Sequence, residues 1–228
     1  MGESFLAEVI KSWENNLIKD DLKLAYLPSP GIVKLRISII GKNKASSEEK
    51  LNYYISELIK LIPDQIYGFG NASMEGVVGE LLKEKNQTLS TAESCTGGNV
   101  SKMLTSLSGS SSFFNGSIIS YTNQSKSELL DVNEQNIEKY GAVSQQVVEQ
   151  MAENVRLKFN SDFGISTSGI AGPSGGTTEK PVGTVWIAVA NKDKVISKKL
   201  NLGYNRERNI HVSSISVLNL LRLELLKN

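Results

Sequence analysis

Three side chains that can act as nucleophiles or hydrogen-bond donors stand together in the stretch STAESCTGG, where Ser94, Cys95 and Thr96 precede Gly97 and Gly98. The preceding residues are typical of a short strand, and an apolar pattern of helical period follows. At the carboxyl end of a strand in an α/β sheet, the amides that begin the next helix favour an anion or a developing oxyanion. The competing interpretation is that Ser94 or Thr96 only caps the helix and the glycines only form the turn.

A nucleophile needs a base, and the chain has one histidine, His211, which lies in an apolar helical pattern near the C-terminus. This scarcity disfavours a cysteine–histidine pair for Cys95, a Ser-His-Asp triad and a histidine zinc site. A predicted strand ends at Tyr121, and Lys126 follows one turn into the next predicted helix. Either side chain can act as a base if its surroundings lower its pKa. On spacing alone, the two residues fit an exposed surface loop equally well.

A glycine-rich segment, STSGIAGPSGGTTEKPVGTV at 166–185, follows another predicted strand. Such a loop can bind phosphate through its backbone N–H groups, which makes its glycines and Lys180 candidates for that role. It does not match the Walker pattern, because no Gly-Lys-Ser/Thr run occurs in it. The same segment is also compatible with a long hairpin loop.

The elements that would position these residues divide the chain near residue 70. The first 70 residues predict a small α+β domain of helix, strands and helix, with a helix at 3–17, a turn at LPSPG (27–31), a strand at 32–40 and a helix at 45–63. The stretch GFGNAS (68–73) is predicted as a linker. Over 71–228 strands and helices alternate, which predicts a layered α/β domain: strands at 87–92, 111–123, 162–169, 182–190 and 195–202, and helices at 73–86, 97–107, 144–159 and 205–226.

Composition is typical of a soluble globular protein, with 39% hydrophobic and 21% charged residues. The formal net charge of +1 argues against a dominant nucleic-acid surface, and a single cysteine excludes an internal disulfide. No apolar run approaches the roughly 18 residues of a membrane span, and the acidic amphipathic N-terminus is unlike a signal peptide. We therefore expect a cytoplasmic protein.

Five motifs carry a resemblance to a known family: TAESCTGG, SYTNQSK, YGAVS, SGIAGPSGG and KPVGTVW. In order and spacing they resemble the CinA C-terminal domain family, the nicotinamide-nucleotide amidases or nicotinamide mononucleotide deamidases, over about residues 74–226. Residues 1–70, with GESFLAEVI and LPSPGIVKLRISI, resemble the KH-like middle domain of full-length CinA proteins. Full-length members have a further N-terminal domain, similar to molybdopterin-binding proteins and linked to ADP-ribose pyrophosphatase activity. No segment of this chain resembles that domain, so we do not expect that activity.

The resemblance implies hydrolysis of the carboxamide of nicotinamide mononucleotide to nicotinate mononucleotide and ammonia, with no metal or organic cofactor. By motif match Ser94 is the nucleophile and Tyr121 and Lys126 complete the site, with the choice of base left open. Backbone N–H groups at residues 95–97 would hold the oxyanion. The predicted substrate contacts are Cys95, Thr96, Gly97, Gly98, Asn123, Ser168, Gly169, Gly172, Gly175, Gly176 and Lys180.

Two other classes of function stay open. One is a nucleotide- or phosphate-binding module without catalysis, against which the presence of all three predicted catalytic residues argues. The other is a nucleic-acid-associated competence or damage-response protein, suggested by the KH-like segment. The one GXXG match, GVVG at 76–79, lies in an apolar helical pattern outside the small domain, so nucleic acid is not the expected partner.

We also expect a homodimer through the second domain. The predicted C-terminal helix has an apolar surface wider than the stripe that a single core requires, and surplus apolar surface usually marks an interface. The alternative is that this helix is buried on both sides within one chain. The first domain is expected to be dispensable for chemistry.

Overall fold

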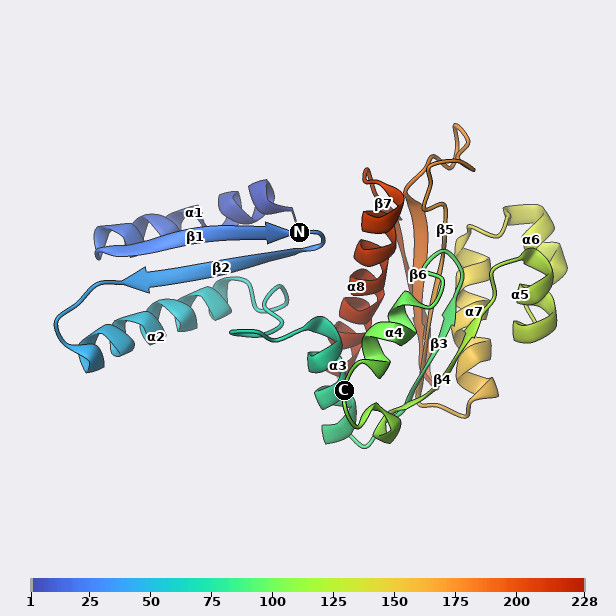
Figure 1. Cartoon of the computed structure of the whole chain (residues 1–228), viewed down its shortest axis with the longest axis horizontal. Helices are drawn as coiled ribbons and strands as arrows, with labels where there is room; N and C mark the ends of the chain where they lie inside the picture. Colours follow the sequence, from blue (N-terminus) through green and yellow to red (C-terminus); the bar gives the residue numbers. More distant parts are fainter. Residues whose placement is uncertain (1, 228) are drawn as a thin grey trace. The chain divides into compact units, whose positions relative to one another are not determined.

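A computed structural model describes residues 2–227, which form two compact units, one up to Gly68 and one from Phe69 onward. Figure 1 shows the elements of both units in chain order. Each unit has its own sheet, and each is described separately below.

The first unit is an antiparallel hairpin with helices, formed by α1 (Glu3–Lys19), β1 (Leu22–Ser29), β2 (Ile32–Ile39) and α2 (Lys44–Leu61). The register pairs Leu22 with Ile39 and Ser29 with Ile32, so the reversal falls at Pro30 and Gly31. The predicted turn at 27–31 is therefore wrong for its first three residues, which belong to β1. Pro28 is compatible with β1 because the strand has one neighbour and its other edge needs no N–H donor.

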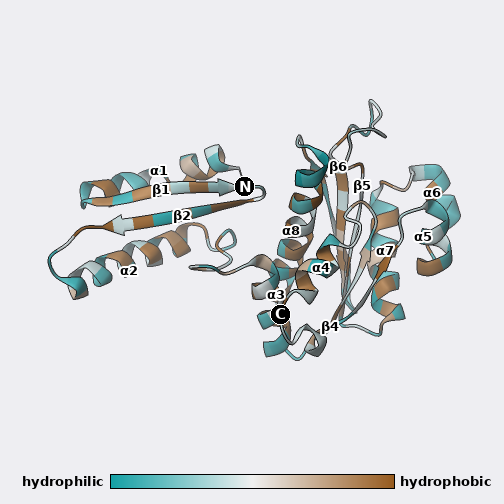
Figure 2. Ribbon diagram, viewed as in Figure 1, coloured by the Kyte–Doolittle hydropathy of each residue, from teal (hydrophilic) through white to brown (hydrophobic). Residues whose placement is uncertain are grey.

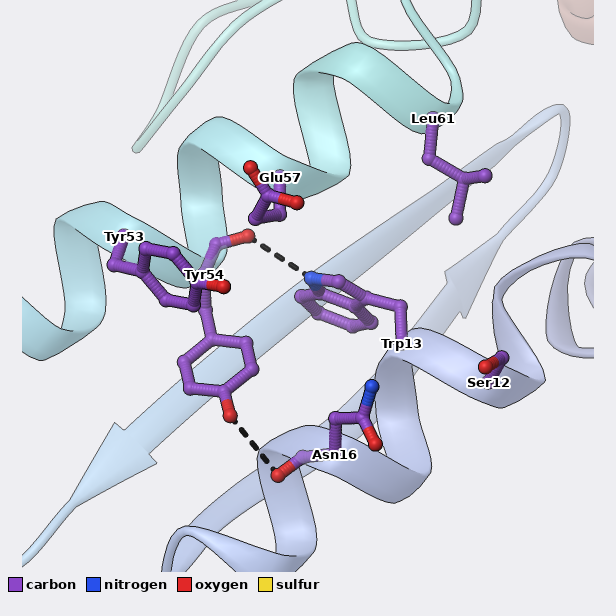
Figure 3. Close-up of a pocket in the computed structure, with 7 residues that line it drawn as sticks. All are labelled: Ser12, Trp13, Asn16, Tyr53, Tyr54, Glu57 and Leu61. Carbon is purple, nitrogen blue, oxygen red and sulfur yellow. Dashed lines mark hydrogen bonds between the residues drawn. The ribbon is translucent and has the colours of Figure 1, made fainter.

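Two aromatic side chains, Trp13 of α1 and Tyr54 of α2, join the otherwise aliphatic buried core of the first unit. Trp13 donates from its indole Nε1 to the Tyr54 carbonyl at 3.0 Å, and the two rings pack edge to face (Figure 3). The Tyr54 hydroxyl lies 2.9 Å from the Asn16 carbonyl and 2.8 Å from Asp20 Oδ2, two acceptors that share its one hydrogen. Beside them lies a cavity of about 270 Å³, lined by Ser12, Trp13, Asn16, Tyr53, Tyr54, Glu57 and Leu61.

The second unit contains a five-stranded sheet within the described residues, in the order β4-β3-β5-β6-β7. Its strands are β3 (Leu89–Glu93), β4 (Phe114–Ile119), β5 (Phe163–Gly169), β6 (Thr184–Ala190) and β7 (Val195–Asn201). Strands β4, β3 and β5 are parallel, and β6 and β7 continue the sheet antiparallel. The inner strand β3, which lies between β4 and β5, is buried at every position, as a strand covered on both faces must be.

Helices cover both faces of this sheet (Figure 1). One face carries α3 (Met74–Glu84), α4 (Asn99–Thr105) and α8 (Arg206–Leu225). The other carries α5 (Asn123–Leu130), α6 (Glu134–Tyr140) and α7 (Gln145–Lys158). The predicted layered α/β architecture with a small α+β unit before it is confirmed, while α6 was not predicted.

The apolar surface of α8 is covered within the chain. The helix packs against α3, α4, β5 and β6, and its buried residues include Ile215, Leu218, Leu221 and Leu225. Figure 2 shows α8 with both apolar and polar residues along its length. Burial on two sides accounts for the wide apolar surface, so α8 does not support the homodimer, which stays a prediction. Among residues 2–227, no helix combines the length and the apolarity that crossing a bilayer requires.

Candidate active site

Ser94 follows directly after β3, and the alternation of side chains along that strand explains the direction in which it points. Ser90 lies on the α7 face, where its hydroxyl donates to the Val155 carbonyl at 3.1 Å. Glu93 lies on the opposite face, where it accepts from the N-terminal amides of α4. Because successive side chains alternate, Ser94 returns to the face of α5 and α7, and there it meets Lys126 of α5.

The turn after Ser94 depends on its two glycines. Gly97 and Gly98 have φ values of 59° and 97°, a region that residues with a Cβ adopt at a cost. The Gly97 amide donates to the Ser94 carbonyl at 3.1 Å, so one of the three amides predicted for an oxyanion is already used within the turn. The amides of Cys95 and Thr96 donate to no backbone carbonyl within residues 2–227.

Lys126 is the most unusual side chain of the unit, because its ammonium is buried with 1% of the residue exposed. Its Nζ lies 3.0 Å from the Ser94 Oγ and 2.8 Å from the Ser120 carbonyl, with the Thr122 carbonyl at 3.5 Å. None of the ion pairs found in the described part of the chain involves this lysine. Burial without a carboxylate lowers the pKa of Lys126 to about 8.

Cys95 is buried beside Ser94, and burial raises the pKa of its thiol to about 12. A thiol with that pKa is protonated at neutral pH, and the protonated form is a poor nucleophile. Ser94 is therefore the better nucleophile of the two, because its hydroxyl has a base within hydrogen-bond distance.

Tyr121 forms no hydrogen bond with Ser94 or Lys126 within the described residues. The residue is 57% exposed, and its hydroxyl accepts from Arg206 Nη2 at 2.8 Å rather than from Lys126. The other terminal nitrogen of Arg206 donates to the Gly172 carbonyl at 2.8 Å. Arg206, the first residue of α8, therefore links the segment after β4 to the glycine-rich loop. The sequence did not predict a role for Arg206.

The glycine-rich segment is the loop of the β5–β6 hairpin, which was the alternative interpretation of its sequence. Gly169, Gly172 and Gly176 have Val182 or Val185 where a Cβ would lie, so close packing requires these glycines, whereas Gly175 is more open. Lys180 donates to the Tyr140 carbonyl, which ties the loop to the end of α6.

Two further predicted contacts have places in the fold. Ser168 donates to the Ala142 carbonyl at 2.7 Å and holds the segment that precedes α7. Asn123 is the exposed first residue of α5, after the Thr122 cap. Neither side chain forms a hydrogen bond with Ser94 or Lys126. Within residues 2–227 no three histidine, cysteine or acidic side chains come together as metal ligands.

Both units match family models. The model described as "CinA C-terminal domain" matches residues 71–225, and the model described as "Damage-inducible protein CinA KH domain" matches residues 1–68. A CinA-like protein of Cytophaga hutchinsonii is 46% identical over 225 residues, which are 99% of this chain and 54% of that protein. A CinA-like protein of Flavobacterium psychrophilum is 45% identical, again with 54% of its length matched. The chain thus spans about half the length of these curated relatives.

Solved structures match a smaller part of the chain. A competence/damage-inducible protein of Agrobacterium tumefaciens aligns with a TM-score of 0.64 and 31% identity, over 69% of this chain and 98% of that one. Competence damage-inducible protein A of Klebsiella pneumoniae aligns with a TM-score of 0.65 and 27% identity, over 67% and 95%. The chain belongs to the CinA family, with a CinA KH domain followed by a CinA C-terminal domain.

Proposed function

We propose that this protein is a serine amidohydrolase that converts nicotinamide mononucleotide to nicotinate mononucleotide and ammonia. The observation that carries the reaction class is the 3.0 Å contact between the Ser94 hydroxyl and the buried Lys126 amine. The substrate follows from the resemblance of the five sequence motifs to nicotinamide-nucleotide amidases. A binding module without catalysis has no need for a desolvated lysine on a serine hydroxyl, because burying the charge is unfavourable.

The surroundings of Lys126 determine the direction of proton transfer. The neutral amine has two hydrogens and one lone pair. The Ser120 and Thr122 carbonyls can only accept, so they take the hydrogens. The lone pair is left for the Ser94 hydroxyl, which can then donate to Lys126. This arrangement supports Lys126 as the base rather than Tyr121, whose hydroxyl is bound to Arg206.

The reaction then proceeds in two steps. Lys126 takes the Ser94 proton as Oγ attacks the carboxamide carbon, and the amides of Cys95 and Thr96 hold the oxyanion. The protonated Lys126 gives its proton to the leaving nitrogen, the C–N bond breaks, and ammonia departs from a seryl ester. Water gives a proton to the same amine as it attacks the ester carbon, the bond to Oγ breaks, and Lys126 returns the proton to Ser94 Oγ as nicotinate mononucleotide leaves.

Arg206 and Tyr121 provide a cation and a phenol at an exposed rim of the same unit. A nucleotide substrate brings a phosphate and a ribose, and a guanidinium is well suited to a phosphate. We assign these two residues to substrate binding. In the glycine-rich loop, packing against Val182 and Val185 explains Gly169, Gly172 and Gly176, and the Tyr140 carbonyl binds Lys180, so we assign none of these four to the substrate.

The test is ammonia release from nicotinamide mononucleotide by the purified chain, with nicotinate mononucleotide identified by mass spectrometry. The expected result is a one-to-one yield of the two products that is absent in a folded Ser94→Ala variant. Failure of the native protein to release ammonia would refute this function.

A further inference from the structure

Glu93 is a buried acidic residue at the end of β3, and the proposed chemistry does not use it. It is the last residue of β3, is exposed to 1%, and points to the face opposite Ser94. Its Oε2 accepts from the Thr96 hydroxyl at 2.7 Å and from the amides of Gly98 at 3.0 Å and Val100 at 3.1 Å. Its Oε1 accepts from the Ser101 amide at 2.8 Å and from the Ser101 hydroxyl.

These five donors are all neutral, and no ion pair found in the described part of the chain includes this carboxylate. A buried carboxylate is costly unless hydrogen bonds satisfy it, and here both oxygens are satisfied by one short segment. An ionised carboxylate can only accept, so the Thr96 hydroxyl must donate to Glu93. The hydrogen in the 2.7 Å contact between Thr96 and Thr167 then comes from Thr167.

The contacts of Glu93 divide the amides of the turn into two groups. The amides of Gly98, Val100 and Ser101 donate to the Glu93 carboxylate. The amides of Cys95 and Thr96, which precede them, donate to no backbone carbonyl in the part of the chain that the structure describes. A substrate oxyanion therefore has available donors at these two residues.

We propose that Glu93 is a positioning residue for the reaction at Ser94. From the far face of the sheet it fixes the 94–98 turn, so that the amides of Cys95 and Thr96 face the substrate oxygen while the Ser94 hydroxyl stays on Lys126. The inference rests on the proposed amidohydrolase function. It goes beyond that function by assigning the geometry of the oxyanion donors to a side chain that never meets the substrate.

Glu93→Gln tests the proposal with little change of volume. The amide group replaces one acceptor oxygen by an NH₂ donor, which then faces the amides of the turn and opposes them. We expect kcat for ammonia release to fall about 10²-fold, the scale for losing one oxyanion donor. KM should change by less than about threefold, since the substrate-binding groups are untouched.

A fluorophosphonate supplies a readout that does not depend on the natural substrate. Its phosphorus bonds to the Ser94 Oγ, fluoride leaves, and the serine proton passes to the base. Labelling followed by mass spectrometry gives both the number of reactive serines per chain and the rate at each one. In Glu93→Gln we expect one reactive serine per chain, a labelling rate lowered by about 10²-fold, and an unchanged midpoint in the pH profile of labelling.

Ser101→Ala is the matched control, because it removes one hydrogen bond to Oε1 but keeps the Ser101 amide and the turn. It should label within about threefold of the native rate. The proposal is overturned if Glu93→Gln is labelled at the native rate. It is also overturned if fewer chains of Glu93→Gln react but each reactive serine is labelled at the native rate, or if the labelling rate of Ser101→Ala falls as far as that of Glu93→Gln. A native protein that labels at Ser94 but releases no ammonia refutes the proposed substrate while leaving the Glu93 test valid.

Discussion

The two units of this chain bury different kinds of side chain. Within the described residues of the first unit, the buried side chains are all aliphatic or aromatic: Leu6, Ile10, Trp13, Leu17, Leu22, Tyr54, Leu58 and Ile62. The second unit buries an apolar core as well, but it also buries a set of hydroxyls and charges around the end of β3: Ser90, Thr91, Glu93, Ser94, Thr96, Ser120, Lys126, Thr167 and Ser168.

Free energy explains why this difference points to function. Burying a polar group gains nothing for stability unless its hydrogen bonds are replaced, and a buried charge is worse. In the first unit the polar groups of both buried aromatic residues have partners: the Trp13 indole donates to the Tyr54 carbonyl, and the Tyr54 hydroxyl lies 2.8 Å from Asp20 Oδ2. Burial and the hydrogen bond to Asp20 raise the pKa of Tyr54 to about 12. The second unit keeps Lys126 and Glu93 buried, and departures of this kind concentrate at functional sites.

The largest effect that follows from this contrast is expected for Ser94→Ala. Loss of the nucleophile should lower kcat for nicotinamide mononucleotide by at least about 10³-fold, because nothing else in the site can form the acyl intermediate. Circular dichroism should show an unchanged fold. Cys95→Ser, assayed in parallel, should turn over within about tenfold of the native rate. The opposite ranking of the two variants would assign the reaction to the thiol.

Lys126→Met should lower activity and raise stability together. Without the base, kcat should fall by at least about 10²-fold. The folded state lowers the pKa of Lys126 from 10.5 to about 8, so at pH 7 the buried ammonium destabilises the fold by about 3 kcal/mol. Methionine has a similar length without that charge, and denaturant titration at pH 7 should show a gain of that order. A variant that is both active and less stable would contradict the role given to Lys126.

The same lowered pKa predicts a pH dependence with a definite sign. The neutral amine is the base, so kcat/KM should rise about tenfold per pH unit below about 8 and level off above it. Between about 8 and 10.5 the folded protein binds fewer protons at Lys126 than the unfolded chain, so unfolding free energy should rise with pH there. Lys126→Met should lack this rise. A flat rate profile between pH 6 and 9 would refute the lysine base.

Local sequence patterns identified the fold class and the stretch around Ser94, because a strand, two glycines and an apolar helix are visible within 20 residues. Arg206 was missed, since its partner Tyr121 lies 85 residues away in the chain. Glu93 was missed for a different reason: its donors are mostly backbone amides, which leave no trace in residue type. The helix α6 was missed because it has seven residues and a single buried one, Ile137.

A change in the first unit should alter stability without altering catalysis. Trp13→Ala removes a buried ring and the hydrogen bond to the Tyr54 carbonyl, which should destabilise this unit by about 3–5 kcal/mol. We expect kcat for ammonia release to stay within about twofold, because Ser94 and Lys126 both belong to the second unit. Calorimetry should show a lowered transition for one unit only. A parallel loss of kcat would mean that the first unit contributes to the reaction.

The smallest effect is expected at Thr184. This buried polar residue has no role in either proposal, so it can be compared with Lys126 and Glu93, each of which has one. Its hydroxyl is buried at the start of β6 and has no hydrogen-bond partner in the described part of the chain. Thr184→Val keeps the β-branched shape and removes the unsatisfied group, so unfolding free energy should rise by about 1 kcal/mol with kcat unchanged. Thr184→Ser, which keeps the hydroxyl and loses the methyl, should be destabilised by about the same amount. If valine instead destabilised the protein, the hydroxyl would have a partner in solution, such as a bound water, and Thr184 would join the satisfied polar groups of this unit.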